Sequence, residues 1–232
     1  MKKTSFFLIV LTFGLGLCSA CNNQPQAPVA PAKLDMKAPQ VEADESGFIF
    51  LEEFPQTDPH LTVKVSDDFT TATICYDGKE IQNVEEEYGL ASDEATVHFL
   101  DANFDGMTDI YIGPGLSRTA NALLVWDEIE QQFRLIQGSS LQNPMLHPET
   151  KSFIEGGSSS YCETDIARNE WDGIEILRKE HLAIVLDPEQ YGEIDVEHRY
   201  TIIDDDDKVL YSTDELESLP EMWQTIISTY GL

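Results

Sequence analysis

The sequence predicts a mainly β fold, built from propeller-like or meandering antiparallel sheets and followed by a C-terminal helix. Three observations support this prediction. Many short runs alternate apolar and polar residues, as in Leu61–Val65, a pattern typical of strands with one buried face. Turn-forming pairs such as Asp77-Gly78 and Asp187-Pro188 separate these runs. The final residues change to helical spacing, so a helix is expected after the sheets.

The chain is long enough for one such domain with appendages. It has 232 residues, of which 41% are hydrophobic and 9% aromatic, enough to bury a sizeable core. Composition divides it into three parts. We expect a signal peptide over 1–20, a tether over 21–46, and a β-rich domain over 47–232 that contains an acidic loop at 101–109.

The first part has the features of an export signal. Two lysines follow Met1, and residues 6–17 form an apolar run interrupted by one threonine and two glycines. A helix of this length spans about 18 Å, whereas the hydrocarbon core of a bilayer is about 30 Å thick. The run is therefore interpreted as the apolar part of a signal peptide and not as a membrane span.

The residues that follow, Leu17-Cys18-Ser19-Ala20-Cys21, resemble the lipobox of bacterial lipoproteins. The resemblance implies that the Cys21 thiol takes a diacylglycerol and that the signal peptide is cut immediately before it. The protein would then be anchored to a bacterial cell membrane. Asn22, in place of an aspartate, favours the outer membrane, on its periplasmic or surface side. The alternative is ordinary secretion, with cleavage after Ala20 and no lipid.

The second part is expected to hold the domain away from the membrane. Residues 21–46 are rich in Pro, Ala and Gln and have no apolar periodicity, which is typical of a semi-extended tether. From about Gly47 the composition changes to short β-like runs.

The third part contains the expected strands, which are short and bounded by turn-forming residues. They are Phe48–Glu52, Leu61–Val65, Ala72–Tyr76, Thr96–Leu100, Asp109–Ile112, Ala122–Trp126, Gln132–Ile136, Tyr161–Arg168, Ile174–Arg178, Leu182–Leu186, His198–Ile203 and Val209–Tyr211. The helix is expected at about 213–230. Two Ser-x-x-Glu capping boxes, which begin at Ser212 and Ser218, precede apolar residues at helical spacing.

The stretch 101–109 carries the one motif with recognisable chemistry. Oxygen-bearing residues occupy alternate positions, and a glycine at the sixth permits the positive φ of a tight curl. A hard cation such as Ca²⁺ takes six to eight oxygen ligands. The expected ligands are Asp101, Asn103, Asp105, the carbonyl of Met107, and Asp109.

This stretch departs from the EF-hand. The twelfth position, where an EF-hand has a bidentate glutamate, is Ile112, and both flanks read as strands. We therefore expect a strand–metal–strand element whose calcium is structural and pins two strands. The alternative is a solvated turn, because Asp and Asn are common in turns for their own hydrogen-bonding reasons.

Residues Phe99–Ile110 look like the calcium loop of FG-GAP and integrin-α-like propeller blades. More narrowly, the chain resembles a family of bacterial periplasmic lipoproteins with an incomplete, propeller-like β fold. The matching segments after the loop are Leu123–Asp127 with Phe133, Asn143–Lys151, and Gly156–Tyr161. The resemblance covers roughly residues 95–185. It implies a calcium-stabilised fold, and some relatives are immunity proteins that place a loop in the cleft of a peptidoglycan hydrolase.

The charge narrows the possible partners. Lys and Arg number 14 against 43 Asp and Glu, a net charge of −29. Nucleic-acid binding, and docking on anionic lipid through a basic patch, both require clustered cations, so these functions are excluded. A metal ion or a cationic protein remains as the expected partner. Because no catalytic motif occurs, we expect a non-enzymatic lipoprotein that binds a macromolecular partner, such as a basic peptidoglycan hydrolase.

Two other functions stay open. One is a glycan-acting hydrolase that uses paired carboxylates. The other is a surface lipoprotein that binds a glycan or solute in an aromatic-lined groove, with residues such as Trp171 or Tyr161.

The two remaining cysteines are Cys75 and Cys162. An exported pair can oxidise to a disulfide that restricts the unfolded chain. Two separate buried thiols explain the sequence equally well.

Overall fold

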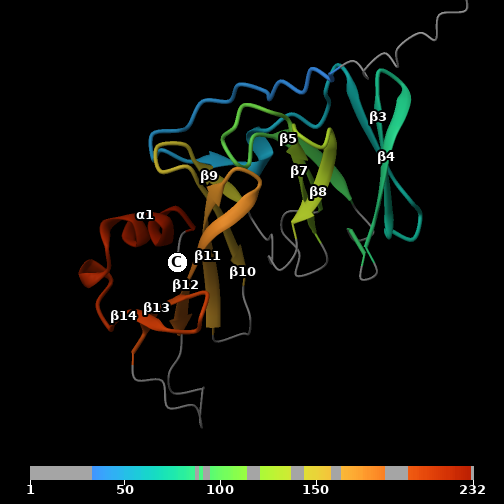
Figure 1. Cartoon of the computed structure of the whole chain (residues 1–232). Coiled ribbons are helices and arrows are strands. Elements are labelled where there is room, and N and C mark those ends of the chain that lie inside the picture. Colours follow the sequence, from blue (N-terminus) through green and yellow to red (C-terminus); the bar gives the residue numbers. More distant parts are fainter. Residues whose placement is uncertain are drawn as a thin grey trace, which may run out of the picture. The chain divides into compact units, whose positions relative to one another are not determined.

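The computed structural model describes residues 33–86, 89–90, 95–113, 121–136, 144–157, 163–185 and 198–230 (Figure 1). Leu34–Leu232 forms one compact unit. The expected signal peptide, Cys21, Tyr161 and Cys162 lie outside the described residues. No helix in the described part is long and apolar enough to cross a membrane.

The fold class predicted from the sequence is confirmed, because the described residues form three antiparallel sheets and one α-helix. The three-stranded sheet contains β2 (Leu61–Val65), β3 (Thr71–Tyr76) and β4 (Lys79–Glu85). The four-stranded sheet contains β5 (Thr96–Leu100), β6 (Asp109–Gly113), β7 (Ala122–Asp127) and β8 (Gln132–Ile136). Both are simple meanders, and no closed propeller is present among the described strands.

The seven-stranded sheet has the order β1-β9-β10-β11-β12-β13-β14. Its strands are β1 (Ile49–Phe50), β9 (Met145–His147), β10 (Ser152–Gly157), β11 (Glu163–Asp172), β12 (Glu175–Val185), β13 (Tyr200–Asp204) and β14 (Val209–Thr213). The pairing of β1 with β9 brings the start of the domain beside its middle. The two strands expected at Ile174–Arg178 and Leu182–Leu186 are one continuous strand, β12, over Glu175–Val185, with Ile174 in the preceding turn and Leu186 outside the described residues.

The helix begins later than the sequence predicts. Helix α1 spans Glu221–Tyr230, and a short 3-10 turn, Leu216–Ser218, precedes it. Thr213, expected at the helix start, instead pairs with Tyr200 in the sheet. Leu219 is extended, with ψ 155°, because a residue before proline avoids the helical region. The helix can therefore start only after Pro220, so the first capping box is not used.

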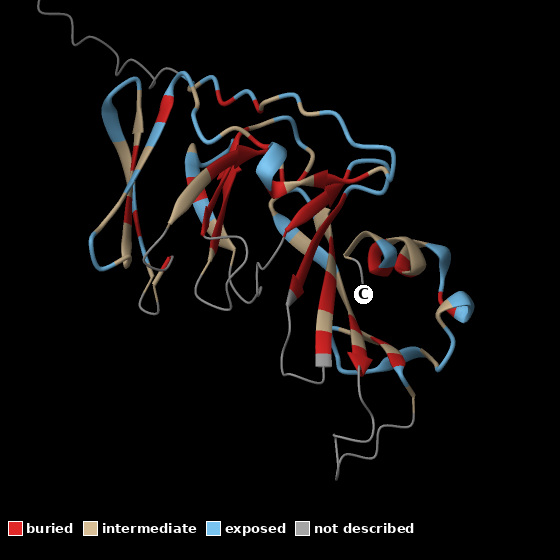
Figure 2. Cartoon of the chain, turned by 180° about the vertical axis from the view of Figure 1, so that it is seen from behind, coloured by how far each residue is buried: buried red, intermediate tan, exposed pale blue. Residues whose placement is uncertain are grey.

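Three apolar clusters join these elements. One, containing Ile74 and Trp126, links the three- and four-stranded sheets. A second, containing Tyr111 and Phe153, links the four- and seven-stranded sheets. The third packs Trp223 of α1 against the seven-stranded sheet. The four-stranded sheet is thus covered on both faces, and every residue of β6 and β7 is buried (Figure 2). Burial on both faces accounts for their continuous apolar sequences.

Candidate metal loop

The acidic loop, residues 101–109, connects β5 to β6 as the strand–loop–strand prediction requires. Leu100 and Asp109 are paired across the two strands and close the loop at its base. The curl uses two residues at positive φ, Phe104 at 61° and Gly106 at 85°. Glycine reaches this backbone region without a steric penalty, which explains its place in the motif.

Three of the predicted ligands gather at the curl. The Asp105 N–H donates to Asp101 Oδ1 at 3.0 Å and to Asn103 Oδ1 at 3.3 Å. The second oxygen of Asp101 accepts from the Gly106 N–H at 2.9 Å. Asp105 Oδ1 in turn accepts from the Met107 N–H at 2.8 Å. The side-chain oxygens therefore fold the loop through its own amides.

Asp109 has a different role. Its side chain is fully buried, and its two oxygens accept from the Ala102 N–H at 2.8 Å and from the Trp126 N–H at 2.9 Å. It therefore ties the loop to β7. Burial raises the pKa of Asp109 well above its usual range, and the charges of Asp105 and Asp101 raise it further. Burial also raises the pKa of Asp101.

The predicted ligands carry the oxygen atoms that a hard cation prefers, but their side chains do not all face one common centre. Among the described residues, no Lys or Arg forms an ion pair with Asp101, Asp105 or Asp109. Within the same residues, no three His, Cys, Asp or Glu side chains are grouped so that they could hold a metal ion. Asp109 faces backbone amides, whereas Asp101, Asn103 and Asp105 share the curl. The calcium assignment stays a prediction.

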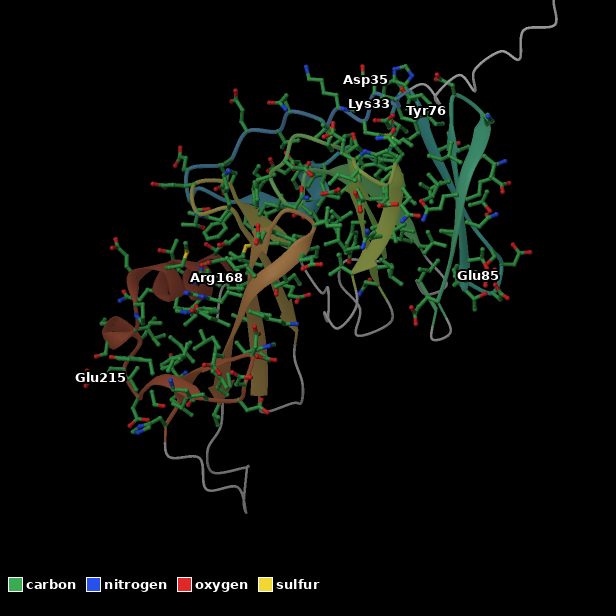
Figure 3. The ribbon with its side chains drawn as sticks, in the orientation of Figure 1. Lys33, Asp35, Tyr76, Glu85, Arg168 and Glu215 are labelled. Atoms are coloured by element: carbon green, nitrogen blue, oxygen red, sulfur yellow. The ribbon has the colours of Figure 1, made fainter. Side chains whose placement is uncertain are left out.

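Residues just after Lys33 pair with the acidic loop, which the sequence did not predict. The Thr108 N–H donates to the Met36 carbonyl, and the Ala38 N–H donates to the Gly106 carbonyl. Met36 and Ala38 are 2% and 3% exposed, so this part of the expected tether belongs to the compact unit. Asp35, immediately before Met36, accepts at its carbonyl from the Tyr76 hydroxyl at 3.3 Å (Figure 3).

A signal for this pairing was present in the sequence. Leu34, Met36 and Ala38 are apolar at every second position, which is the spacing of a half-buried extended segment. The pairing uses the carbonyls of Met36 and Gly106, so the Met107 carbonyl takes no part in it.

An acidic groove of about 450 Å³ lies beside the loop. It is bounded by the β7–β8 turn and the β11–β12 turn, and the Asn103 amide donates to the Gly173 carbonyl of the latter turn at 3.0 Å. Among the described residues that line it, the only basic one is Arg134, which pairs with Asp127 at 2.7 Å. The acidic lining residues are Asp105, Asp127, Glu128, Glu130, Asp172 and Glu175.

The other candidate residues are not brought to this site. Trp171 packs edge-on against Phe153, with ring centroids 6.4 Å apart, in the cluster between two sheets. Cys75, on β3, is half-buried and forms no disulfide with a described residue. Because Cys162 lies outside the described residues, the disulfide also stays a prediction.

Comparison with known proteins gives one distant similarity. No protein-family model matches the chain, and no curated protein matches it. Among solved structures, the chain is similar to one described as a Xanthomonas type IV secretion system related protein. The two share 12% sequence identity with a TM-score of 0.39, over 75% of this chain and 96% of the other. No family is therefore assigned, and the resemblance to calcium-loop lipoproteins stays a prediction.

Proposed function

We propose that this protein is an exported, lipid-anchored lipoprotein of the bacterial cell envelope that binds a basic macromolecular partner without catalysing a reaction. Calcium in the acidic loop stabilises its β-rich domain, and a peptidoglycan hydrolase is the partner class that we favour. One observation supports the proposal most directly. The acidic loop holds two carboxylates, Asp101 and Asp105, in a partly buried curl and a third, Asp109, at its buried base, and no basic side chain of the described residues pairs with any of them.

The calcium part of the proposal follows from this uncompensated charge. Burying a carboxylate costs free energy unless it is paired or hydrogen-bonded. Hydrogen bonds from backbone N–H groups offset only part of this cost. Asp101, Asn103 and Asp105 would hold the ion together with the Met107 carbonyl, and Asp109 adds a third negative charge at the loop base. Bound calcium supplies the missing positive charge.

The partner part follows from the net charge and from the export signal. A surface of net charge −29 attracts a basic protein from a distance and raises the rate of association, in a way that salt weakens. The signal peptide and the lipobox-like Cys21 would place this surface in the cell envelope, where basic enzymes act on peptidoglycan.

Calcium binding is tested by calorimetric titration of the chain from Asn22 onward. We expect one site with a Kd on the order of 10⁻⁴–10⁻³ M, as in extracellular calcium modules. Asp105→Asn should weaken uptake, whereas Asp206→Asn, which removes one exposed acid elsewhere, should leave it unchanged. A wild-type chain that takes up no calcium would refute this part.

Partner binding is tested with a basic muramidase of the lysozyme type, assayed for binding and for inhibition in low salt with calcium present. We expect both, and we expect salt to weaken both. If the enzyme neither binds nor loses activity, the partner class is wrong.

A further inference from the structure

The exposed large apolar residues of the described chain are not scattered. Four of the five, Leu177, Val209, Leu210 and Tyr211, lie on β12 and β14 of the seven-stranded sheet, and the fifth, Ile129, lies on the β7–β8 turn. We name the group of four the edge patch. Leu177 is 65% exposed and Leu210 is 45% exposed. Grouped apolar exposure of this kind marks interaction surfaces on soluble proteins.

The edge patch has a shape that can receive a side chain. β14 is the last strand of its sheet and pairs only with β13 among the described strands (Figure 1). Its register places Val209 opposite Ile203 and Tyr211 opposite Ile202, so Leu210 is a bulge residue with no opposite partner. Bulges redirect side chains at sheet edges. Leu210 and Leu177 line the same groove, which has a volume of about 370 Å³.

One wall of this groove is acidic. Asp204, Asp205 and Asp206 line it, and they belong to the acidic turn, residues 204–207, between β13 and β14. Two of them accept hydrogen bonds from backbone amides: Asp204 from the Asp206 and Lys208 N–H groups, and Asp205 from the Lys179 N–H. No basic side chain in the described ranges forms an ion pair with these three carboxylates.

The basic residues of the groove are already paired. Arg178 contacts Glu180 at 3.4 Å, and Lys179 contacts the buried Glu155 at 3.5 Å. The charge that the groove offers to a ligand is therefore negative, and it lies directly beside exposed leucine.

We propose that the edge patch is the docking surface for the basic partner. An apolar side chain of the partner enters the groove between Leu177 and Leu210, and flanking lysine or arginine side chains pair with the acidic turn. The buried apolar contact supplies affinity, and the charges supply orientation and rate of association. The inference rests on the proposed function for the sign of the partner's charge. A second copy of this chain is disfavoured, because it would bring two acidic turns together.

The test uses two synthetic peptides of equal positive charge, one alternating lysine with leucine and the other alternating lysine with serine. Their affinities for the chain from Asn22 onward, which keeps the whole compact unit, are measured by fluorescence anisotropy at low and at physiological ionic strength. We expect the leucine peptide to bind about tenfold more tightly than the serine peptide, because truncating a central apolar contact typically costs this much.

Two pairs of variants locate the binding. Leu177→Ser with Leu210→Ser should abolish the preference for leucine, whereas Ile129→Ser, at the fifth exposed apolar residue, should keep it. The double variant Asp205→Asn with Asp206→Asn should bind both peptides more weakly, and its affinity for them should depend less on salt. The matched charge control is Glu52→Gln with Glu53→Gln, two exposed acids outside the patch. All these side chains are exposed, and thermal melting confirms that each variant is folded.

Three results, besides the muramidase result given at the end, would overturn the inference. The first is equal affinity of the two peptides for the wild type. The second is an equal loss of the preference for the leucine peptide in Ile129→Ser and in the leucine variants. The third is a dimer of this chain in size-exclusion chromatography that Leu210→Ser dissociates. The proposed partner class fails on a different result, which is no binding of the basic muramidase to the wild type. If the basic muramidase binds the leucine variants as it binds the wild type, the partner class stands and the edge patch is wrong.

Discussion

The acidic loop and the acidic turn have similar compositions and opposite environments. Each joins two adjacent antiparallel strands, and each curls through residues at positive φ, Gly106 in the loop and Asp207 in the turn. In the loop, Asp109 is fully buried, whereas Asp205 and Asp206 of the turn are exposed. The difference shows that acid density alone does not assign a role. A buried carboxylate needs hydrogen bonds or a positive charge inside the protein, whereas an exposed one can be hydrated or can pair with a cation of a partner.

The comparison has a direct consequence for mutagenesis. Changes in the acidic loop should alter stability and calcium response, and changes in the acidic turn should alter partner binding with little effect on stability.

The largest effect is expected for Asp109→Ala. The substitution leaves the buried Ala102 and Trp126 amides without an acceptor, and an unmet buried donor costs about 1–3 kcal/mol. We expect the free energy of unfolding, measured in urea, to fall by roughly 2–4 kcal/mol. The matched substitution Asp206→Ala in the acidic turn should change it by less than about 0.5 kcal/mol. Equal losses would remove the distinction between the two regions.

The second effect concerns the backbone of the two curls. Gly106 has φ 85°, and an alanine in a left-handed conformation is strained by about 1–2 kcal/mol. Gly106→Ala should lower the free energy of unfolding by about that amount. Asp207, with φ 58°, already tolerates this region, so Asp207→Gly should shift stability by less than about 1 kcal/mol in either direction. Thermal melts of both variants test this contrast.

The sequence predicts most where one local pattern decides the outcome. The strands β2, β5 and β8 were bounded correctly from alternation and turn chemistry. The acidic loop was placed between two strands because its flanks are apolar and β-branched. The apolar runs of β6 and β7 were recognised as strands, although their burial on both faces depends on sheets formed by distant residues.

The sequence is least informative for strands that form because of their contacts with neighbouring strands. β4 is mostly polar, and its Gln82 amide exchanges two hydrogen bonds of 2.7 Å with the backbone of Phe133 on β8. No local periodicity signals such a contact. β9 has only three residues and exists because it pairs with β1 and β10. β10, which ends in two glycines, likewise depends on its neighbours.

The same limit applies to the candidate site. The spacing of residues 101–109 predicted the curl and the positive φ at Gly106. It did not predict that Asp109 turns to the Trp126 amide, because that contact requires β7 to lie beside β6. The alternation at 34–38 is visible in the sequence, but the Pro- and Ala-rich residues around it favour the prediction of a tether.

The third effect is the response to calcium. At a free calcium concentration about ten times the Kd, binding to the native state alone adds about 1.4 kcal/mol to the free energy of unfolding. Chelation should remove this increment, which is measured as a fall in Tm. Asp101→Asn should remove it as well, whereas Asp205→Asn in the acidic turn should preserve it. An increment that persists in Asp101→Asn would place the ion elsewhere.

The smallest effect is expected from acidification, which should lower the stability of the protein through a buried histidine on β5, the strand that leads to the acidic loop. His98 on β5 is 4% exposed, its Nδ1 lies 3.3 Å from the Phe54 carbonyl, and burial lowers its pKa. Between that lowered pKa and the unfolded value of about 6.5, the unfolded state binds more protons, so stability falls as the pH drops below about 6.5.

His98→Gln should flatten this part of the pH profile. Some dependence should remain, because burial also lowers the pKa of His147. The control is His198→Gln, at a half-exposed histidine that lies before β13, 3.5 Å from Asp214. Chemical denaturation across the range compares the two variants. If His198→Gln flattens the profile as much as His98→Gln, burial on β5 is not the cause of the pH dependence.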